Sequence, residues 1–271
     1  IILGTNIIYD AHELESRKNG QTKILSFCTF LMEKICWKYI DLFISVSNSI
    51  ISWYKTNLGP KDSILILNSP KNNNSRRNSS RFLPDGYYFH DLYNIPTDKL
   101  IFLYLGILSK GRGLSIIYKI FANYNINAHV VFTGYGPLLD EIKRYANKFS
   151  NIHLHKPVAH NEVIELSKNA DIGLCLIENV SLSDYYSLPN KFFEYSFAGL
   201  HVLSSDLPEM KKISAKYLIG TYCKPTIKKV KKSVEHLIKN PPSKINDDLN
   251  ELGWDAQTER LITSYKKLIR K

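Results

Sequence analysis

The chain has 271 residues, 44% of them apolar, and it carries a formal net charge of +11 at pH 7. This length and apolar content predict a folded protein with one large or two medium-sized domains, which excludes an intrinsically disordered chain. The charge favours an anionic partner such as phosphate groups. Basic residues are not interleaved with aromatic ones as in nucleic-acid modules, so no nucleic acid is expected as a partner.

The apolar stretches are too interrupted for a membrane span. The longest one, residues 24–46, is broken by Glu33, Lys34, Lys38 and Asp41, whereas a span requires roughly 18 uninterrupted apolar residues. We therefore expect no transmembrane helix.

Short β-branched runs alternate with helical patterns, which is typical of parallel sheets covered by helices. The first part of the chain is expected to contain strands near 6–9, 42–47 and 63–68, joined by helices over 22–39 and 48–56. Three strands are too few for an independent doubly wound sheet, so we expect a partial Rossmann-like domain. The opening carries no initiator methionine and no signal peptide, and we interpret it as a beginning cut from something longer.

The polar, Asn- and Ser-rich stretch 69–81 predicts a surface loop between two halves. Beyond residue 100 the alternation becomes regular and predicts a complete doubly wound domain. Its strands are expected at 100–106, 129–134, 151–155, 171–177 and 201–205, and its helices near 114–124, 137–148, 160–169 and 190–198. The expected domains are a partial N-terminal domain with its linker (1–95), a C-terminal domain (96–253) and an amphipathic helix packing back toward the N-terminal part (254–271).

Three turns follow strands of the C-terminal domain, at the sheet edge where ligands bind in open α/β folds. The first, LGILSKGRGL, carries Lys110 and Arg112 among its glycines. The second, FTGYGPLL, has Gly134 and Gly136, which let the backbone approach a ligand. Each turn alone is consistent with ordinary strand-to-helix geometry, and only their succession along the chain favours a ligand site.

The third turn opens a helix with Pro189, Asn190 and Lys191, and Glu194 follows one turn later. A helix start presents free N–H groups and a positive dipole end to an anion. We expect Arg112 and Lys191 to bind a pyrophosphate, and Glu194 to accept hydrogen bonds from both hydroxyls of a ribose.

Nearly the whole chain resembles retaining glycosyltransferases of the group 1 family, which have the GT-B architecture of two Rossmann-like domains across a cleft. The segments that carry the resemblance, in the family's order, are IIYDAHELES, FISVSNSI, SILILNSP, LYLGILSKGRGL, VVFTGYGPL, ADIGLCLI, LPNKFFEYSFAGLHVLSSD and GWDAQTERLITSYKKL. The resemblance implies a GT-B-like α/β fold with a complete Rossmann-like C-terminal domain and a partial Rossmann-like N-terminal domain.

The resemblance also implies roles for individual residues. The implied catalytic residues are His12, beside the transferred sugar, and Arg112 and Lys191, which neutralise the leaving diphosphate. Pro157 and Val158 would frame the base. The residues implied in donor binding are Gly106, Lys110, Arg112, Gly113, Gly134, Gly136, Pro157, Val158, Pro189, Asn190, Lys191 and Glu194. A buried, hydrogen-bonded structural histidine remains the alternative for His12.

Two positions depart from the family pattern and leave the donor sugar open. Many relatives have a Glu-x7-Glu pair, but Tyr186 stands eight residues before Glu194. Asp184 or Glu178 could substitute for the missing acid from a shifted loop. Ile107 replaces an arginine that often follows the first glycine.

The family works without a catalytic metal, and we expect none here. His153, His155 and His160 fit a strand and loop, without the further ligands that a zinc site requires. The cysteines have no zinc spacing and predict buried reduced thiols in a cytosolic protein. They are Cys28, Cys36, Cys175 and Cys223.

The helix expected over 22–40 mixes apolar residues with lysines. Core packing is the favoured interpretation of its apolar residues. The alternative is a basic, aromatic face lying on an anionic membrane, which would suit a lipid-linked acceptor. The lysine cluster within 228–232 is interpreted as a solvated helix face.

We therefore expect a retaining hexosyltransferase that moves a sugar from a nucleotide-sugar donor to a glycan or lipid-linked acceptor. The pathway would be cell-surface polysaccharide synthesis, such as that of lipopolysaccharide or capsule. The enzyme would work in the cytoplasm or as a peripheral protein at the inner face of the membrane. Two alternatives stay open, namely a non-catalytic nucleotide-sugar-binding or assembly subunit and a GT-B-fold sugar-nucleotide epimerase.

Overall fold

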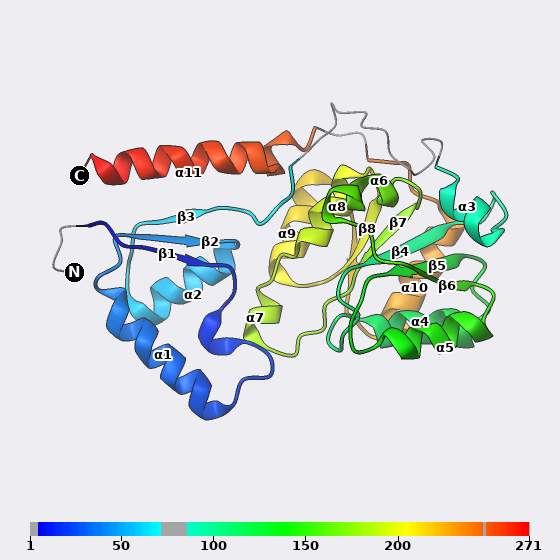
Figure 1. Ribbon diagram of the computed structural model, residues 1–271, viewed down its shortest axis with the longest axis horizontal. Coiled ribbons are helices and arrows are strands. Elements are labelled where there is room, and N and C mark those ends of the chain that lie inside the picture. The colour runs from blue at the N-terminus through cyan, green and yellow to red at the C-terminus, as the bar shows by residue number, and fades with distance from the viewer. Residues whose placement is uncertain (1–4, 72–85, 246–247, 271) are drawn as a thin grey trace.

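Two separate parallel β-sheets organise the computed structural model, which describes residues 5–71, 86–245 and 248–270 (Figure 1). The smaller sheet has the order β1-β2-β3, with β1 (Ile8–Ala11), β2 (Leu42–Ser45) and β3 (Ser63–Leu65). Its crossovers contain a short 3-10 helix η1 (Glu15–Arg17), α1 (Lys23–Trp37) and α2 (Asn48–Leu58). Thr22 and Ser47 start α1 and α2, because their side chains accept hydrogen bonds from the backbone N–H groups of Leu25 and Ile50, three residues further along the chain.

The last helix of the chain, α11 (Trp254–Ile269), covers the face of the smaller sheet opposite α1 and α2 (Figure 1). Its Leu261 and Leu268 pack against a small cluster that contains Leu42, Ile44 and Ile66. The amphipathic pattern of 254–271 thus brings the C-terminal helix back to the N-terminal sheet.

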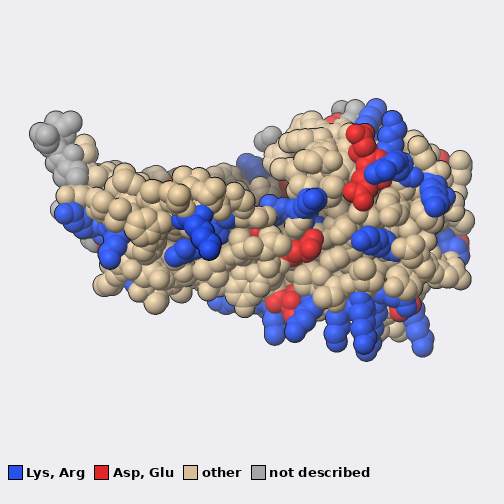
Figure 2. All heavy atoms as spheres, turned by 90° about the horizontal axis from the view of Figure 1, so that it is seen from below, with Lys and Arg blue, Asp and Glu red and all other residues tan. Residues whose placement is uncertain are grey.

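Helix α1 turns most of its apolar residues outward. Ile24, Phe27 and Met32 are exposed, whereas Glu33 and Trp37 are buried. The core packing expected for 22–40 is therefore wrong for most of its apolar residues, because polar contacts decide which side of the helix faces the sheet. Figure 2 shows the molecule of Figure 1 from below. The surface over α1 is tan and blue in this view, the colours of uncharged and basic residues.

The cysteines are all reduced, but the expectation that they are buried is wrong for two of them. Cys28 and Cys36 are exposed on α1, Cys175 is buried and Cys223 is intermediate. The outward rotation of α1 is the reason for this difference.

The larger sheet has the order β6-β5-β4-β7-β8-β9 and is parallel throughout. Its strands are β4 (Ile101–Leu105), β5 (His129–Thr133), β6 (Ile152–His155), β7 (Ile172–Cys175), β8 (His201–Ser205) and β9 (Gly220–Cys223). The chain winds outward from β4 to β6, returns to β7 and then winds the other way. This reversal between β4 and β7 opens a crevice at the carboxyl ends of the two strands, where ligands bind in doubly wound sheets.

Side chains of β4 alternate between the two faces of this sheet. Leu103 and Leu105 belong to the core on one face, and Phe102 and Tyr104 belong to the core on the other face. The first face is covered by α3 (Tyr88–Tyr93), α6 (Val163–Ser167), α8 (Asn190–Phe197) and α9 (Pro208–Tyr217), and the second by α4 (Leu114–Asn123), α5 (Leu139–Lys148) and α10 (Ile227–Lys239). Short elements η2 (His160–Glu162), α7 (Leu182–Tyr185) and η3 (Asn250–Leu252) complete the chain.

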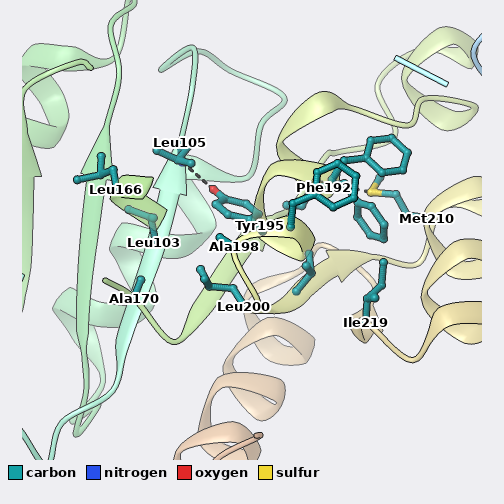
Figure 3. Packing of buried hydrophobic residues seen from close by; sticks show 14 of the residues in the cluster. Leu103, Leu105, Leu166, Ala170, Phe192, Tyr195, Ala198, Leu200, Met210 and Ile219 are labelled. Carbon is teal, nitrogen blue, oxygen red and sulfur yellow. Dashed lines mark hydrogen bonds between the residues drawn. The ribbon is translucent and has the colours of Figure 1, made fainter. Parts of the chain in front are cut away.

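Helix α8 sits closely against the sheet, and Tyr195 fixes its position (Figure 3). The Tyr195 hydroxyl accepts a hydrogen bond of 2.7 Å from the backbone N–H of Leu105. A Cβ atom at Gly173 would lie 2.2 Å from the Tyr195 ring, so only glycine permits this approach. The start of α8 is therefore held rigidly at the carboxyl end of the sheet.

Polar contacts join the two units. The backbone N–H and the hydroxyl of Ser49 both donate to Glu209 Oε1, at 3.0 and 2.6 Å. The backbone N–H of Leu14 donates to the Ser183 hydroxyl at 3.1 Å. Tyr186 also packs against the core of the smaller unit.

The expected strands and crossover helices are found with boundaries that differ by a few residues, but the structure adds β9, α3 and α9. Helix α3 packs in the core of the larger sheet through Phe89, although the sequence grouped residues up to 95 with the N-terminal part. Most of the loop expected over 69–81 lies outside the described residues. Lys228, Lys229 and Lys232 are exposed on α10, so the solvated helix face is confirmed.

Candidate functional site

A cavity of about 470 Å³ opens at the crevice between β4 and β7. It is bounded by the turns after β4, β5 and β6 and by the start of α8. The sequence-predicted residues that line it are Gly106, Arg112, Gly134, Pro157, Val158, Pro189, Asn190, Lys191 and Glu194. Segments that are far apart in the sequence thus meet around one space, which we call the switch-point pocket.

Lys191 lies in the first turn of α8, one residue inside the helix start. Its Nζ atom stands 3.8 Å from the centroid of the Tyr104 ring, a cation–π contact that holds the ammonium group over the end of β4. A Cβ atom at Gly106 would lie 3.6 Å from the same Nζ atom, so the glycine leaves the space beside the ammonium group open. The positive charge and the free N–H groups of the α8 start converge on this space.

Glu194 is buried one turn further along α8 and still lines the pocket. Burial raises the pKa of its carboxyl group, while the nearby His160 and Lys191 act in the opposite direction. The Nδ1 atom of His160 is 3.7 Å from Glu194 Oε1 and comes from the segment after β6. A buried carboxylate beside a cavity can accept hydrogen bonds from hydroxyl groups of a ligand.

The turn after β4 carries the two other predicted cations. Arg112 lines the switch-point pocket and a second cavity next to it, whereas Lys110 lines only the second cavity. The backbone oxygen of Gly111 accepts a hydrogen bond of 3.0 Å from the N–H of Glu178, which ties this turn to the segment after β7. Arg112 is therefore placed where the two cavities meet.

Three of the predicted glycines have packing reasons for their positions. A Cβ atom at Gly134 would lie 1.8 Å from the backbone oxygen of Gly106, and one at Gly136 would lie 2.7 Å from that of Leu108. Both glycines have positive φ angles, so the turns after β4 and β5 can lie directly against each other. A side chain at Gly113 would also clash, since a Cβ atom there would lie 2.4 Å from the backbone oxygen of Leu176. Gly113 and Gly136 line neither cavity.

The second cavity, also of about 470 Å³, lies between the two units. His12 lines it, is exposed, and has its Nε2 atom 3.4 Å from Asp10 Oδ2. This exposure excludes the alternative of a buried structural histidine for His12. Lys18 and Asp184 also line this cavity, which we call the inter-unit cleft.

The missing first acid of the family pair has a structural explanation. Tyr186 packs into the core of the smaller unit with Tyr54 and Leu14, so this position serves the contact between units. Of the two possible substitutes, Asp184 lines the inter-unit cleft and accepts a hydrogen bond of 2.7 Å from the Ser181 hydroxyl. Glu178 Oε1 instead accepts a hydrogen bond of 3.2 Å from the N–H of Gly113.

Several lining residues were not predicted from the sequence. Tyr104 and Tyr135 line the switch-point pocket, and Lys18 lines the inter-unit cleft. His160 was considered only as a metal ligand, although its place beside Glu194 follows from the turn after β6. The position of Tyr135 between Gly134 and Gly136 could have indicated a side chain directed away from the packed turns.

The histidines of the β6 region contact one another or aromatic residues. His153 Nε2 is 3.0 Å from His129 Nδ1, and His155 Nε2 is 3.0 Å from the Tyr88 hydroxyl. In residues 5–71, 86–245 and 248–270, no three His, Cys, Asp or Glu side chains come together in a way that could hold a metal ion. Burial raises the pKa of Cys175, the last residue of β7, to about 12, so this thiol is protonated at neutral pH.

No helix in the described part of the chain is long and apolar enough to cross a membrane. A search of curated proteins by sequence found no match.

Solved structures with the same fold include HepE of Anabaena in complex with UDP. At 11% identity and a TM-score of 0.71, the similarity covers 98% of this chain and 71% of that one. WaaG, a glycosyltransferase involved in lipopolysaccharide biosynthesis, is 16% identical with a TM-score of 0.54, covering 80% of this chain and 62% of that one. A TarM variant of S. aureus crystallised with UDP is 9% identical with a TM-score of 0.60, and the similarity covers 96% of this chain and 48% of that one.

These similarities confirm the expected GT-B-like fold class, with its two Rossmann-like units. The family model described as glycosyl transferases group 1 matches residues 89–253, which is more than half of the chain and includes every residue that lines the switch-point pocket. The chain therefore belongs to the group 1 family of glycosyl transferases.

Proposed function

We propose that the switch-point pocket binds a nucleoside diphosphate sugar and that the chain transfers its hexose, with retention of configuration. The observation that carries this proposal is the convergence of Arg112, Lys191 and Glu194 on one cavity at the end of the sheet. The two cations and the start of α8 suit a diphosphate. The buried carboxylate suits the vicinal hydroxyls of a ribose.

In this proposal the leaving group of the reaction is the nucleoside diphosphate. Arg112 and Lys191 stabilise the negative charge that develops on it as the glycosidic bond breaks, which lowers the barrier to its departure. Pro157 and Val158 frame the base. His12 lies beside the transferred sugar, and no metal takes part.

The acceptor would enter through the inter-unit cleft, which adjoins the pocket at Arg112. We propose a growing glycan or a lipid-linked acceptor in cell-surface polysaccharide synthesis, because relatives such as WaaG are involved in lipopolysaccharide biosynthesis. The enzyme would then act at the cytoplasmic face of the membrane.

The phosphate assignment is tested by calorimetry with UDP and with uridine. UDP is the first probe because HepE and TarM were crystallised with it. Lys191→Ala should weaken UDP binding about 10- to 100-fold, the equivalent of roughly 1.5–3 kcal/mol for hydrogen bonds to a charged group. Binding of uridine, which has no phosphate, should change little.

Lys119→Ala is the matched control, because Lys119 is exposed on α4 and lines neither cavity. It should bind UDP as tightly as the wild type. Equal losses for UDP and uridine in Lys191→Ala, or no loss for either, would contradict the phosphate assignment.

A second candidate is a nucleotide-sugar-binding subunit without transferase activity. It is favoured by Tyr186, which occupies the place of the first family acid and packs between the units. Incubation with UDP-glucose and candidate acceptors separates the two functions. Release of UDP together with a glycosylated product, whose anomeric configuration is read by NMR, supports the transferase, and tight binding without turnover supports the binding subunit.

A further inference from the structure

We propose that the outer side of α1 is a docking surface for an anionic phospholipid bilayer. This deepens the proposed function, because it specifies which surface of the glycosyltransferase meets the membrane that carries a lipid-linked acceptor. The surface is called the apolar face of α1. Its residues are Ile24, Leu25, Phe27, Leu31, Met32 and Ile35.

The apolar face of α1 is far more exposed than the apolar side of an ordinary surface helix. Ile24 is 77% exposed, Phe27 65% and Met32 60%. At 3.6 residues per turn, the six residues cover about half of the helix circumference. A helix of a globular protein normally turns such a face to the core, and a continuous exposed patch marks an interaction site.

The rotation of α1 about its axis is fixed by polar contacts on its inner side. The hydroxyl groups of Tyr9 and Tyr54 both donate to Glu33 Oε1. Two helical turns before Glu33, the Ser26 hydroxyl donates to the backbone oxygen of Ser16 at 2.5 Å. Because these contacts hold the polar side of α1 inward, the helix cannot roll its apolar face into the core without leaving Glu33 unpaired.

The charges around the apolar face suit a negatively charged surface. Lys23, Lys34 and Lys38 are exposed and lie along one border of the face, since their spacings of 11 and 4 residues return to the same side of a helix. Glu33 is the only acidic residue of α1, and it points inward. Figure 2 accordingly shows tan and blue over α1 and no red.

An apolar face bordered by lysines is typical of helices that lie in the interface of anionic membranes. A second copy of the chain is a poorer occupant. A symmetric contact through α1 would bring the same lysines together in two molecules that each carry a net charge of +11.

The proposal is tested by flotation of the full chain with vesicles of phosphatidylcholine alone and with 30% phosphatidylglycerol. We expect binding only to the anionic vesicles. Phe27→Glu/Met32→Glu should bind them at least about tenfold more weakly. Lys34→Gln/Lys38→Gln should lose roughly fivefold per lysine, the equivalent of about 1 kcal/mol each, and this loss should shrink in 0.5 M salt.

Leu218→Glu is the matched control, because Leu218 is 79% exposed in the larger unit, remote from α1 in the sequence and in the fold. It should bind vesicles as the wild type does. UDP binding should be unchanged in every variant, so failure of the docking surface is distinguishable from failure of the nucleotide site.

Three outcomes would overturn the proposal. They are no binding of the wild type to anionic vesicles, undiminished binding by Phe27→Glu/Met32→Glu, and a wild-type dimer that this variant converts to a monomer. Cys28 is exposed and lies four residues from both Ile24 and Met32, so a polarity-sensitive fluorophore on it, in a Cys36→Ser/Cys223→Ser background, reports from within the apolar face itself. Its emission should shift to the blue with anionic vesicles and stay unchanged with neutral ones.

Discussion

Two buried glutamates, one in each unit, have opposite surroundings. Glu33 on α1 is 9% exposed and Glu194 on α8 is 7% exposed, so both carboxyl groups are largely removed from water. Glu33 Oε1 receives hydrogen bonds from two tyrosine hydroxyls of its own unit. Glu194 instead borders an open cavity, and the Nδ1 atom of His160 lies 3.7 Å from its Oε1 atom.

The comparison separates a structural carboxyl group from one that is available to a ligand. Burial, with Glu33 nearby, raises the pKa of both Tyr9 and Tyr54, so these hydroxyls stay protonated and keep donating to the carboxylate. The hydrogen-bond partners of Glu33 Oε1 are therefore supplied by the fold. Burial raises the pKa of Glu194, which means that its ionised form is costly, and hydroxyl groups of a bound ligand would lower that cost.

The largest effect is expected for Glu194→Ala on nucleotide binding. Loss of a buried carboxylate that accepts ribose hydroxyls should weaken UDP binding about 30- to 100-fold, the equivalent of roughly 2–3 kcal/mol. Calorimetry with UDP and with 2′,3′-dideoxy-UDP isolates the ribose contribution. The wild type should prefer UDP, and Glu194→Ala should bind the two ligands equally.

The corresponding change in the other unit provides the control. Glu33→Gln should leave UDP affinity within about twofold of the wild type, because Glu33 lines neither cavity. If Glu194→Ala still discriminated between UDP and the dideoxy analogue, the assignment of Glu194 to the ribose would be wrong.

The sequence was sufficient to predict the doubly wound unit and most of the switch-point pocket. Its glycine-rich turns and the Pro189-Asn190-Lys191 helix start are local features, and a parallel sheet necessarily brings such turns to one edge. The contact of Lys191 with Tyr104 could not be predicted in this way. It depends on the distance between α8 and β4, which Tyr195 and Gly173 set through packing.

The orientation of α1 was predicted wrongly for a physical reason. Periodicity shows that a helix has an apolar side, but it does not show which side faces the sheet. In the sequence, Glu33 counted only as a charge that interrupts an apolar stretch. Only the tertiary arrangement brings it to Tyr9 on β1 and Tyr54 on α2, and this leaves Phe27 and Met32 outside.

The next largest effect is expected for Glu33→Ala on stability. Glu33→Ala removes the acceptor that the buried Tyr54 hydroxyl and the partly buried Tyr9 hydroxyl share, which should lower the free energy of unfolding by about 2 kcal/mol. The melting temperature should fall by roughly 4–8 °C in a thermal unfolding experiment. Glu33→Gln keeps a carbonyl acceptor and should lose clearly less, and equal losses in the two variants would show that the tyrosine contacts are not the cause.

The smallest effect concerns a half-buried pair in the larger unit, His129 and His153, which lines neither of the two cavities. Burial lowers the pKa of His129, and the nearby His90 and Lys99 add to this effect. Burial, together with the nearby His129, lowers the pKa of His153 to about 4. Tyr93 of α3 stacks on His153 with ring centroids 4.4 Å apart. Both imidazoles are therefore neutral in the folded protein at pH 7.

Between pH 6.5 and 4 the unfolded chain binds more protons at His153 than the folded chain does, so stability falls as the pH falls through this window. Because His153 is partly exposed, we expect its titration to lower the free energy of unfolding by only about 1 kcal/mol over this pH window. Thermal unfolding at pH 7.5 and 5 should show a smaller drop in melting temperature for His153→Gln than for the wild type. His236→Gln, on the exposed side of α10, should keep the wild-type drop. An equal drop in all three proteins would mean that His153 titrates normally in the folded state, and the packing of α3 over this pair would then be looser than the structure indicates.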